Sequence, residues 1–222
     1  PPISEVASIA YDAINPDLVY AGTLGMGVWK SVDQGASWSA APIPGVPSPV
    51  HVADIESHPD VSGTVYVRVY SYAAGPNPQP RLFLSEDAGA TWQELSDVDT
   101  VFGGMGGIGL VFTPPAPDSG PYTLYSGCGP GLCRSPDGGE TWEAVEGAPR
   151  PELLTAVSDG ERAILYMSSS GGLPTSIGLQ ADRLLDAIPG GGSALTGGVY
   201  RLTTRLQHYQ VYLPCVLKDP TS

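Results

Sequence analysis

Short apolar runs separated by turn residues make up most of this chain. Runs such as LVYAGT (18–23), TVYVRV (64–69) and TLYSGC (123–128) are rich in β-branched, aromatic and other apolar residues. Glycine and proline, 29 and 23 residues of the 222, cluster mainly between such runs. This pattern predicts an all-β protein made of many short strands joined by turns.

An eight-residue motif occurs three times. The copies are SVDQGASW (31–38), SEDAGATW (85–92) and SPDGGETW (135–142). All fit Ser-x-Asp-x-Gly-x-[Ser/Thr]-Trp, and successive aspartates are 54 and then 50 residues apart. The same succession of strand-like runs precedes each copy, so each unit contains four predicted strands in about fifty residues. Such a unit is one blade of a β-propeller.

The predicted fold is therefore a β-propeller, or a propeller fragment, of about four four-stranded antiparallel blades. The blades are expected at about 3–48, 49–100, 101–148 and 149–207, with a C-terminal strand or tail at 208–222. The fourth unit keeps two strand-like runs but lacks the octet. Gly-rich residues 170–197 form an insertion there, and 71–80 form a smaller one in the second unit.

The sequence leaves three ways in which the blades could complete a ring. Four blades rarely close a ring of this repeat type, since most such propellers have more. Further blades could lie upstream, two chains could share one ring, or the chain could form a compact four-bladed ring. The abrupt start at Pro1 and Pro2 favours the first arrangement.

The octets and the strands before them resemble the BNR or Asp-box repeat. That repeat occurs in sialidases, sortilin-type receptors, xyloglucan-cleaving glycosidases and assembly factors of the YCF48 type. The resemblance covers residues 3–145 well and 150–205 loosely, and it implies a fold rather than a function. The ending HYQVYLPCVLK (208–218) resembles that of secreted proteins of Chloroflexi-type bacteria, which implies an extracellular or cell-surface protein.

A structural role is expected for the repeated residues of the octets. Ser and Asp side chains accept hydrogen bonds from nearby amides in turns, Gly permits positive φ, and Trp is expected to be buried between adjacent sheets. The predicted structural Asp-box residues are Ser31, Asp33, Gly35, Trp38, Ser85, Asp87, Gly89, Trp92, Ser135, Asp137, Gly139 and Trp142.

Charge argues against binding to nucleic acid, and hydropathy argues against a transmembrane segment. The net charge is −13, with only ten basic residues, so binding to nucleic acid is not expected. No apolar run reaches the eighteen or so residues that a transmembrane segment needs. The acidity is most simply a solubility feature.

The three cysteines allow one short-range pair. Cys128 and Cys133 flank a Gly-Pro turn, so a hairpin disulfide is the first choice and two free thiols are the alternative. Cys215 is left without an assigned role. No spacing of Cys or His indicates a zinc or haem site, and we expect no metal and no cofactor.

Candidate catalytic residues are few. A xyloglucanase-like enzyme needs two carboxylates facing one cleft. The innermost strand of the second unit carries Asp54 and Glu56 beside His51, and Ser8 stands at the position of Asp54 in the first unit. These carboxylates are weak candidates, and a hydrogen-bonded structural role is favoured. Several arginines follow or precede the octet strands and are expected to point outward there, and His58 is expected at the surface.

Three functions follow from this pattern. The first is a non-catalytic extracellular scaffold that binds a protein or glycan partner, further copies of itself or missing blades, or that serves as a structural subunit of a surface assembly. The second is a xyloglucanase-like glycoside hydrolase fragment. The third is a YCF48-like assembly factor of a membrane complex.

Overall fold

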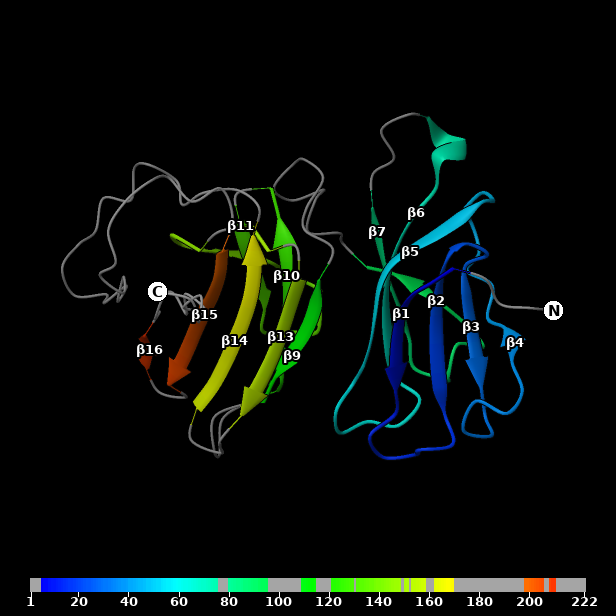
Figure 1. The fold of residues 1–222 in the computed structure, drawn as a ribbon, viewed down its shortest axis with the longest axis horizontal. Coiled ribbons are helices and arrows are strands. Elements are labelled where there is room, and N and C mark those ends of the chain that lie inside the picture. Colours follow the sequence, from blue (N-terminus) through cyan, green and yellow to red (C-terminus); the bar gives the residue numbers. More distant parts are fainter. Residues whose placement is uncertain are drawn as a thin grey trace, which may run out of the picture.

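The protein is described here from a computed structural model. It describes residues 5–75, 80–95, 109–114, 121–129, 131–148, 150–151, 153–158, 162–169, 198–205 and 208–210. Sixteen strands in these residues form four successive groups of four antiparallel strands (Figure 1). The predicted all-β propeller-type fold is confirmed, and we refer to the four groups as blades 1 to 4.

Blades 1 and 2 contain the first eight strands. Blade 1 consists of β1 (Val6–Tyr11), β2 (Val19–Gly25), β3 (Val28–Ser31) and β4 (Ser39–Ala40). Blade 2 consists of β5 (Val50–Ser57), β6 (Val65–Tyr70), β7 (Arg81–Ser85) and β8 (Gln93–Glu94). The end of β2 also pairs with the start of β5, through Leu24 opposite His51, so the two blades form one continuous sheet.

Blades 3 and 4 are separate four-stranded sheets. Blade 3 consists of β9 (Leu110–Thr113), β10 (Thr123–Cys128), β11 (Gly131–Ser135) and β12 (Glu143–Val145). Blade 4 consists of β13 (Leu153–Ser158), β14 (Arg162–Ser169), β15 (Gly198–Arg205) and β16 (His208–Gln210). β16, at the start of the segment assigned to a C-terminal strand or tail, pairs with β15 and completes blade 4.

Alternation along each strand gives every blade two contact faces. In β6, Val65 and Val67 belong to the apolar cluster shared with blade 1, whereas Tyr66 belongs to the cluster shared with blade 3. Successive side chains of a strand point to opposite sides of a sheet. We call these sides the preceding face and the following face of a blade.

Apolar clusters fill the spaces between successive blades. The first lies between blades 1 and 2 and includes Tyr20, Val28 and Phe83. The second lies between blades 2 and 3, and the third between blades 3 and 4, where Tyr125 and Leu165 are buried. Burial of these side chains is the main stabilising contribution to the stack of blades.

Close approach of the sheets requires small residues at certain positions. A Cβ atom on Gly22 of β2 would lie 2.4 Å from Cγ1 of Val52 in β5. No such distance occurs between real side chains, so any larger residue at Gly22 would push blade 2 away from blade 1.

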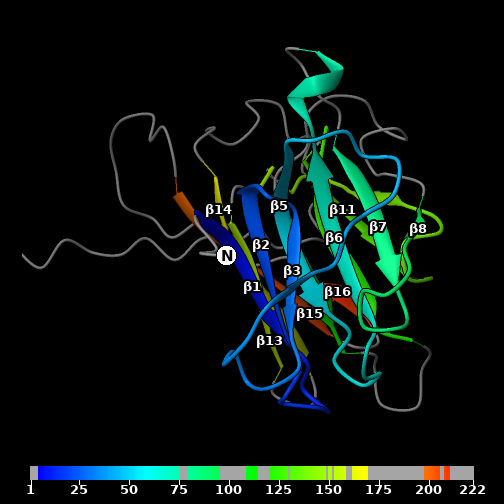
Figure 2. The same cartoon turned by 90° about the vertical axis from the view of Figure 1, so that its right-hand side faces the viewer.

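The insertion in blade 2 begins with one turn of 3₁₀-helix, η1 (Tyr72–Ala74), which projects beyond the end of the sheets (Figures 1 and 2). Ser71 caps this turn, because its hydroxyl accepts a hydrogen bond from the amide of Ala73 at 3.2 Å. The insertion predicted at 170–197 and the cysteine at 215 lie outside the described residues.

Candidate functional site

The three octets, each of which we call a box, share one network of hydrogen bonds. In the first box the Ser31 hydroxyl donates to Asp33 at 2.7 Å and accepts from the amide of Gly35 at 2.8 Å. Asp33 also accepts from the amide of Ser37 at 2.7 Å. The other two boxes repeat this network with Ser85 and Asp87, and with Ser135 and Asp137.

This network explains the charge state of the box aspartates. Hydrogen bonds from the side chain and amide of Ser37 lower the pKa of Asp33 to about 2. Hydrogen bonds from the side chain and amide of Thr91 likewise lower the pKa of Asp87 to about 2. The central glycines have positive φ, at 88° for Gly35, 75° for Gly89 and 95° for Gly139. The boxes are thus turns held by their own side chains, and their carboxylates are already bonded within the turn.

The three box tryptophans differ in burial. Trp142 is 8% exposed within the second cluster, and Trp92 is half-buried against the first cluster. Trp38 is half-buried too, but it belongs to neither cluster, and its indole donates to Gly35 of its own turn at 3.0 Å. The expectation that all three are buried between sheets was wrong for Trp38, because no sheet among the described residues packs against its ring.

The inner strands carry a second polar network that connects three blades. Asp54 of β5 accepts a hydrogen bond from the Ser8 hydroxyl of β1 at 2.7 Å and from the Leu110 amide of β9 at 2.7 Å. It also accepts from the amide of Ile55 at 2.9 Å. Both carboxylate oxygens are therefore bonded, one to blade 1 and one to blade 3.

Burial raises the pKa of both inner carboxyl groups, but only that of Asp54 is opposed by hydrogen bonds. Burial raises the pKa of Asp54, although the bonds from Ser8, Leu110 and Ile55 and the charge of Arg68 oppose this. Burial, together with the nearby charge of Asp54, raises the pKa of Glu56 to about 8. A carboxyl group with such a pKa is largely protonated at neutral pH and could donate a proton.

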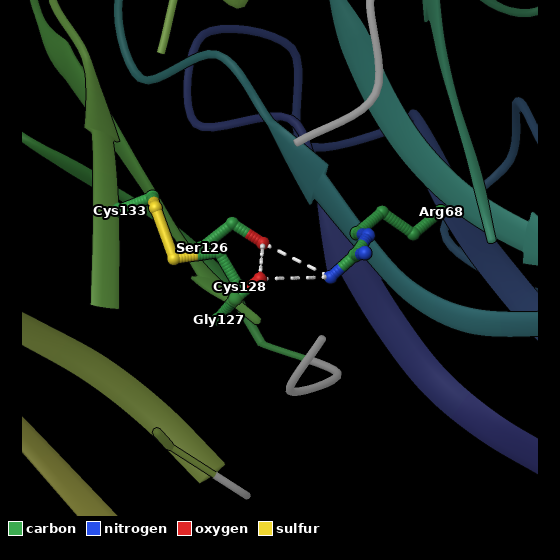
Figure 3. The surroundings of a disulfide bond; sticks show 5 residues. All are labelled: Arg68, Ser126, Gly127, Cys128 and Cys133. Atoms are coloured by element: carbon green, nitrogen blue, oxygen red, sulfur yellow. Dashed lines mark hydrogen bonds between the residues drawn. A yellow bond between two sulfur atoms is a disulfide. The ribbon is translucent and has the colours of Figure 1, made fainter. Parts of the chain in front are cut away.

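Arg68 lies between blades 2 and 3 and is 1% exposed. It stands opposite Asp54 in the pairing of β5 with β6. Figure 3 shows its guanidinium pointing toward β10, where it donates to the Ser126 hydroxyl at 3.1 Å and the Gly127 carbonyl at 3.4 Å. The charge of Arg68, which lies in β6 and not beside an octet, is balanced inside the stack by Asp54.

A disulfide closes the hairpin behind Ser126. Cys128 and Cys133 are joined across β10 and β11, with their Cα atoms 5.8 Å apart (Figure 3). Both cysteines are fully buried in the second cluster. The disulfide thus fixes the sheet against which Arg68 packs.

An aromatic group lies where the insertion of blade 2 begins. His51 and Tyr70 stack with ring centroids 5.1 Å apart. Tyr72 of η1 meets both edge-on, each at 5.5 Å. The Tyr72 side chain is 53% exposed. These three residues, which we call the aromatic platform, form a partly exposed aromatic surface, in which His51 and Tyr70 are half-buried and Tyr72 is exposed.

Two further residues escaped the sequence analysis. Asp12 is 1% exposed and accepts hydrogen bonds from Gly63 and Ser62 of the β5–β6 turn at 2.7 and 3.0 Å, which ties the turns of blades 1 and 2 together. His58, expected at the surface, is half-buried against the rings of Phe112 and Tyr122 in blade 3. Its place before a proline gave no sign of this contact.

Within the part of the chain that the structure describes, no group of three or more His, Cys, Asp or Glu side chains could bind a metal ion. A shallow hollow of about 340 Å³ lies over the second octet, lined by residues that include Glu86, Asp87 and Trp92. No helix among the described residues is both long and apolar enough to cross a membrane.

Comparisons with known proteins found one similar sequence and several similar structures. No family model matches it. It is 28% identical over 183 residues to a xyloglucanase from a Paenibacillus species, covering 75% of this chain and 17% of that protein. It superposes on the GH74 xyloglucanase of Xanthomonas campestris with a TM-score of 0.57 and 18% identity, over 99% of this chain and 32% of that one. YCF48 bound to a D1 peptide gives a TM-score of 0.48 and 13% identity, over 78% and 51% of the two chains.

This is a propeller-type chain. It spans less than a fifth of the curated relative and about a third of the Xanthomonas structure. At 18% identity, the structural likeness establishes the fold and no activity.

Proposed function

We propose that this chain is a non-catalytic propeller scaffold that binds a protein or glycan partner outside the cell. One observation carries this proposal. Asp54, the best-placed inner carboxylate, has both oxygens bonded to groups that hold three blades together. The three hydrogen bonds that Asp54 accepts give it a structural role, and this favours a scaffold over a general base.

The partner surface that we assign is the aromatic platform of His51, Tyr70 and Tyr72. It stands at the end of the strands of blade 2, next to a loop insertion, and scaffolds commonly carry binding residues on such loops. An exposed aromatic face suits the apolar face of a sugar ring or an apolar side chain of a protein. The extracellular location is supported by the Cys128–Cys133 disulfide, since disulfides persist in oxidising compartments.

A glycan-array and pull-down experiment tests this proposal with the variant Tyr72→Ser. Because Tyr72 is 53% exposed, we expect unchanged stability and at least tenfold weaker binding to whichever glycan or extracellular protein the wild-type chain retains. Val61→Ser, an apolar residue 50% exposed in the β5–β6 turn, is the matched control and should bind normally. Equal binding by Tyr72→Ser and wild type would refute the platform.

A second candidate function is xyloglucan hydrolysis. It is favoured by the similarity to a xyloglucanase and by the protonated state of Glu56, which is what a general acid requires. The opposing fact is the occupied state of Asp54. Release of reducing sugar from xyloglucan by the wild-type chain, abolished by Glu56→Gln, would replace the scaffold proposal with this one. The third candidate, an assembly factor of a membrane complex, stays a prediction.

A further inference from the structure

Asp12 and His58 each follow the inner strand of a blade and contact the next blade. The amide of Asp12 donates to the Leu18 carbonyl at 3.0 Å, just before β2. The amide of His58 donates to the Thr64 carbonyl at 2.8 Å, just before β6. The two residues therefore have the same position in blades 1 and 2, but they make their contacts with different chemistry.

Asp12, Ser62 and Gly63 form the contact between blades 1 and 2 that we call the first clasp. The Asp12 carboxylate accepts hydrogen bonds from the Gly63 amide at 2.7 Å and from the Ser62 hydroxyl at 3.0 Å. Burial would raise the pKa of Asp12, but these bonds and those from its own turn hold it below its usual value. The first clasp therefore keeps its charge and its bonds in mildly acidic solution.

His58, Asp60 and Tyr122 form the contact between blades 2 and 3 that we call the second clasp. Nδ1 of His58 accepts a hydrogen bond from the Asp60 amide at 3.2 Å, so this nitrogen must be unprotonated. The imidazole ring lies against Phe112 and Tyr122, with ring centroids 5.1 and 5.3 Å apart. Burial and a hydrogen bond to the Asp60 side chain raise the pKa of Tyr122. Asp60 thus bonds to His58 through its amide and to blade 3 through its carboxylate.

The groups around His58 favour its neutral form. Among the described residues, the titratable groups beside the ring are Asp60 in its own turn and Tyr122 from blade 3. Glu56, two residues earlier on the inner strand, has a pKa of about 8 and is largely uncharged at neutral pH. Burial lowers the pKa of His58, and the charge of Asp60 opposes this shift without reversing it.

Protonation of His58 weakens the second clasp in two ways. The imidazolium cannot accept the hydrogen bond of the Asp60 amide, and it attracts the Asp60 carboxylate away from the Tyr122 hydroxyl. The second clasp also lies where the sheet is interrupted, because blades 1 and 2 form one continuous sheet and blade 3 is a separate one.

We propose that the second clasp is an acid-sensitive contact: in mild acid His58 takes up a proton and releases Tyr122 and the start of β10, while the first clasp stays closed. Blade 3 remains joined to blade 2 through Arg68 and the second apolar cluster. Mild acid thus loosens one end of the contact between these blades without separating them.

Nuclear magnetic resonance of the whole chain at about pH 7.5 and about pH 5 tests this proposal. Protection of the Asp60 amide from hydrogen exchange, relative to an unstructured peptide at the same pH, should fall about fivefold in acid, which is the effect of losing one hydrogen bond. The Gly63 amide, which donates to Asp12, is the internal control and should keep its protection. Overhauser contacts between the rings of His58 and Tyr122 should disappear over the same range.

His58→Gln is the matched variant, because the glutamine oxygen can accept the bond of the Asp60 amide and does not titrate. The Asp60 amide of this variant should have the same protection at both pH values. Asp60→Asn removes the opposing charge and should lower the pKa of His58 further. A His58 pKa above its ordinary value of 6.5, as a cation held by the aromatic rings would give, would overturn the proposal. Equal losses of protection at Asp60 and Gly63, or ring contacts that persist in acid, would overturn it as well.

Discussion

The two faces of blade 1 differ in what covers them, although both have apolar side chains. The following face, with Tyr20 and Val28 fully buried, is closed by blade 2. The preceding face, with Ile9 and Tyr11, is exposed. The difference shows that the repeat specifies contact positions in every blade, and that burial at those positions depends on whether a neighbour is present.

The largest expected effect compares two box tryptophans. Trp142→Ala removes a buried side chain between blades 2 and 3 and should lower the free energy of unfolding by about 3–5 kcal/mol. Trp38→Ala should lower it by about 1 kcal/mol or less, because no sheet packs against that ring. Urea unfolding of the two variants measures both losses. Equal losses would refute the contrast between covered and exposed faces.

The next comparison uses two isoleucines at the same repeat position. Ile55→Ala should cost about 2–5 kcal/mol, because the side chain is 1% exposed in the first cluster. Ile9→Ala should change stability by about 0.5 kcal/mol or less, because this side chain is 66% exposed. Urea unfolding of the two variants measures both losses of stability. A loss of more than about 2 kcal/mol for Ile9→Ala would show that the preceding face of blade 1 is covered within one chain.

A smaller effect concerns pH. The pKa of Glu56 is raised to about 8 in the folded chain from an ordinary value of 4.5, so the folded state holds this proton more tightly than the unfolded state does. The associated stability is present below pH 4.5 and is lost as the pH rises toward 8. Glu56→Gln should therefore match the wild type near pH 4.5 and exceed it by on the order of 1 kcal/mol above pH 8. Parallel unfolding curves at the two pH values check this, and a constant difference would contradict it.

The sequence predicts the repeated parts of this fold well, because local chemistry determines them. Ser31, Asp33 and Gly35 form their turn with partners within six residues, so the octet alone specifies the hydrogen bonds. The inner strands are different. The bonds of Asp54 reach across 46 and 56 residues to Ser8 and Leu110, and no local pattern encodes them.

Arg68 and Trp38 show why exposure is harder to predict than position. Arg68 is buried because Asp54 and two groups of blade 3 surround it, a combination that exists only after the blades stack. Trp38 fits the octet as well as Trp142 does, yet it lacks the neighbouring sheet. The motif gives each residue its place in a blade, and the neighbouring blade decides whether that residue is covered.

The central claim is that Asp54 holds blades together and does not perform acid–base chemistry. The most direct test measures the free energy of unfolding and the hydrolysis of xyloglucan on the same preparations of wild type and Asp54→Asn. We predict no hydrolysis by either protein and a loss of about 1–3 kcal/mol in the variant, because the amide replaces an acceptor that joins three blades. The account would be contradicted if the wild type hydrolyses xyloglucan and Asp54→Asn abolishes this activity without changing the free energy of unfolding.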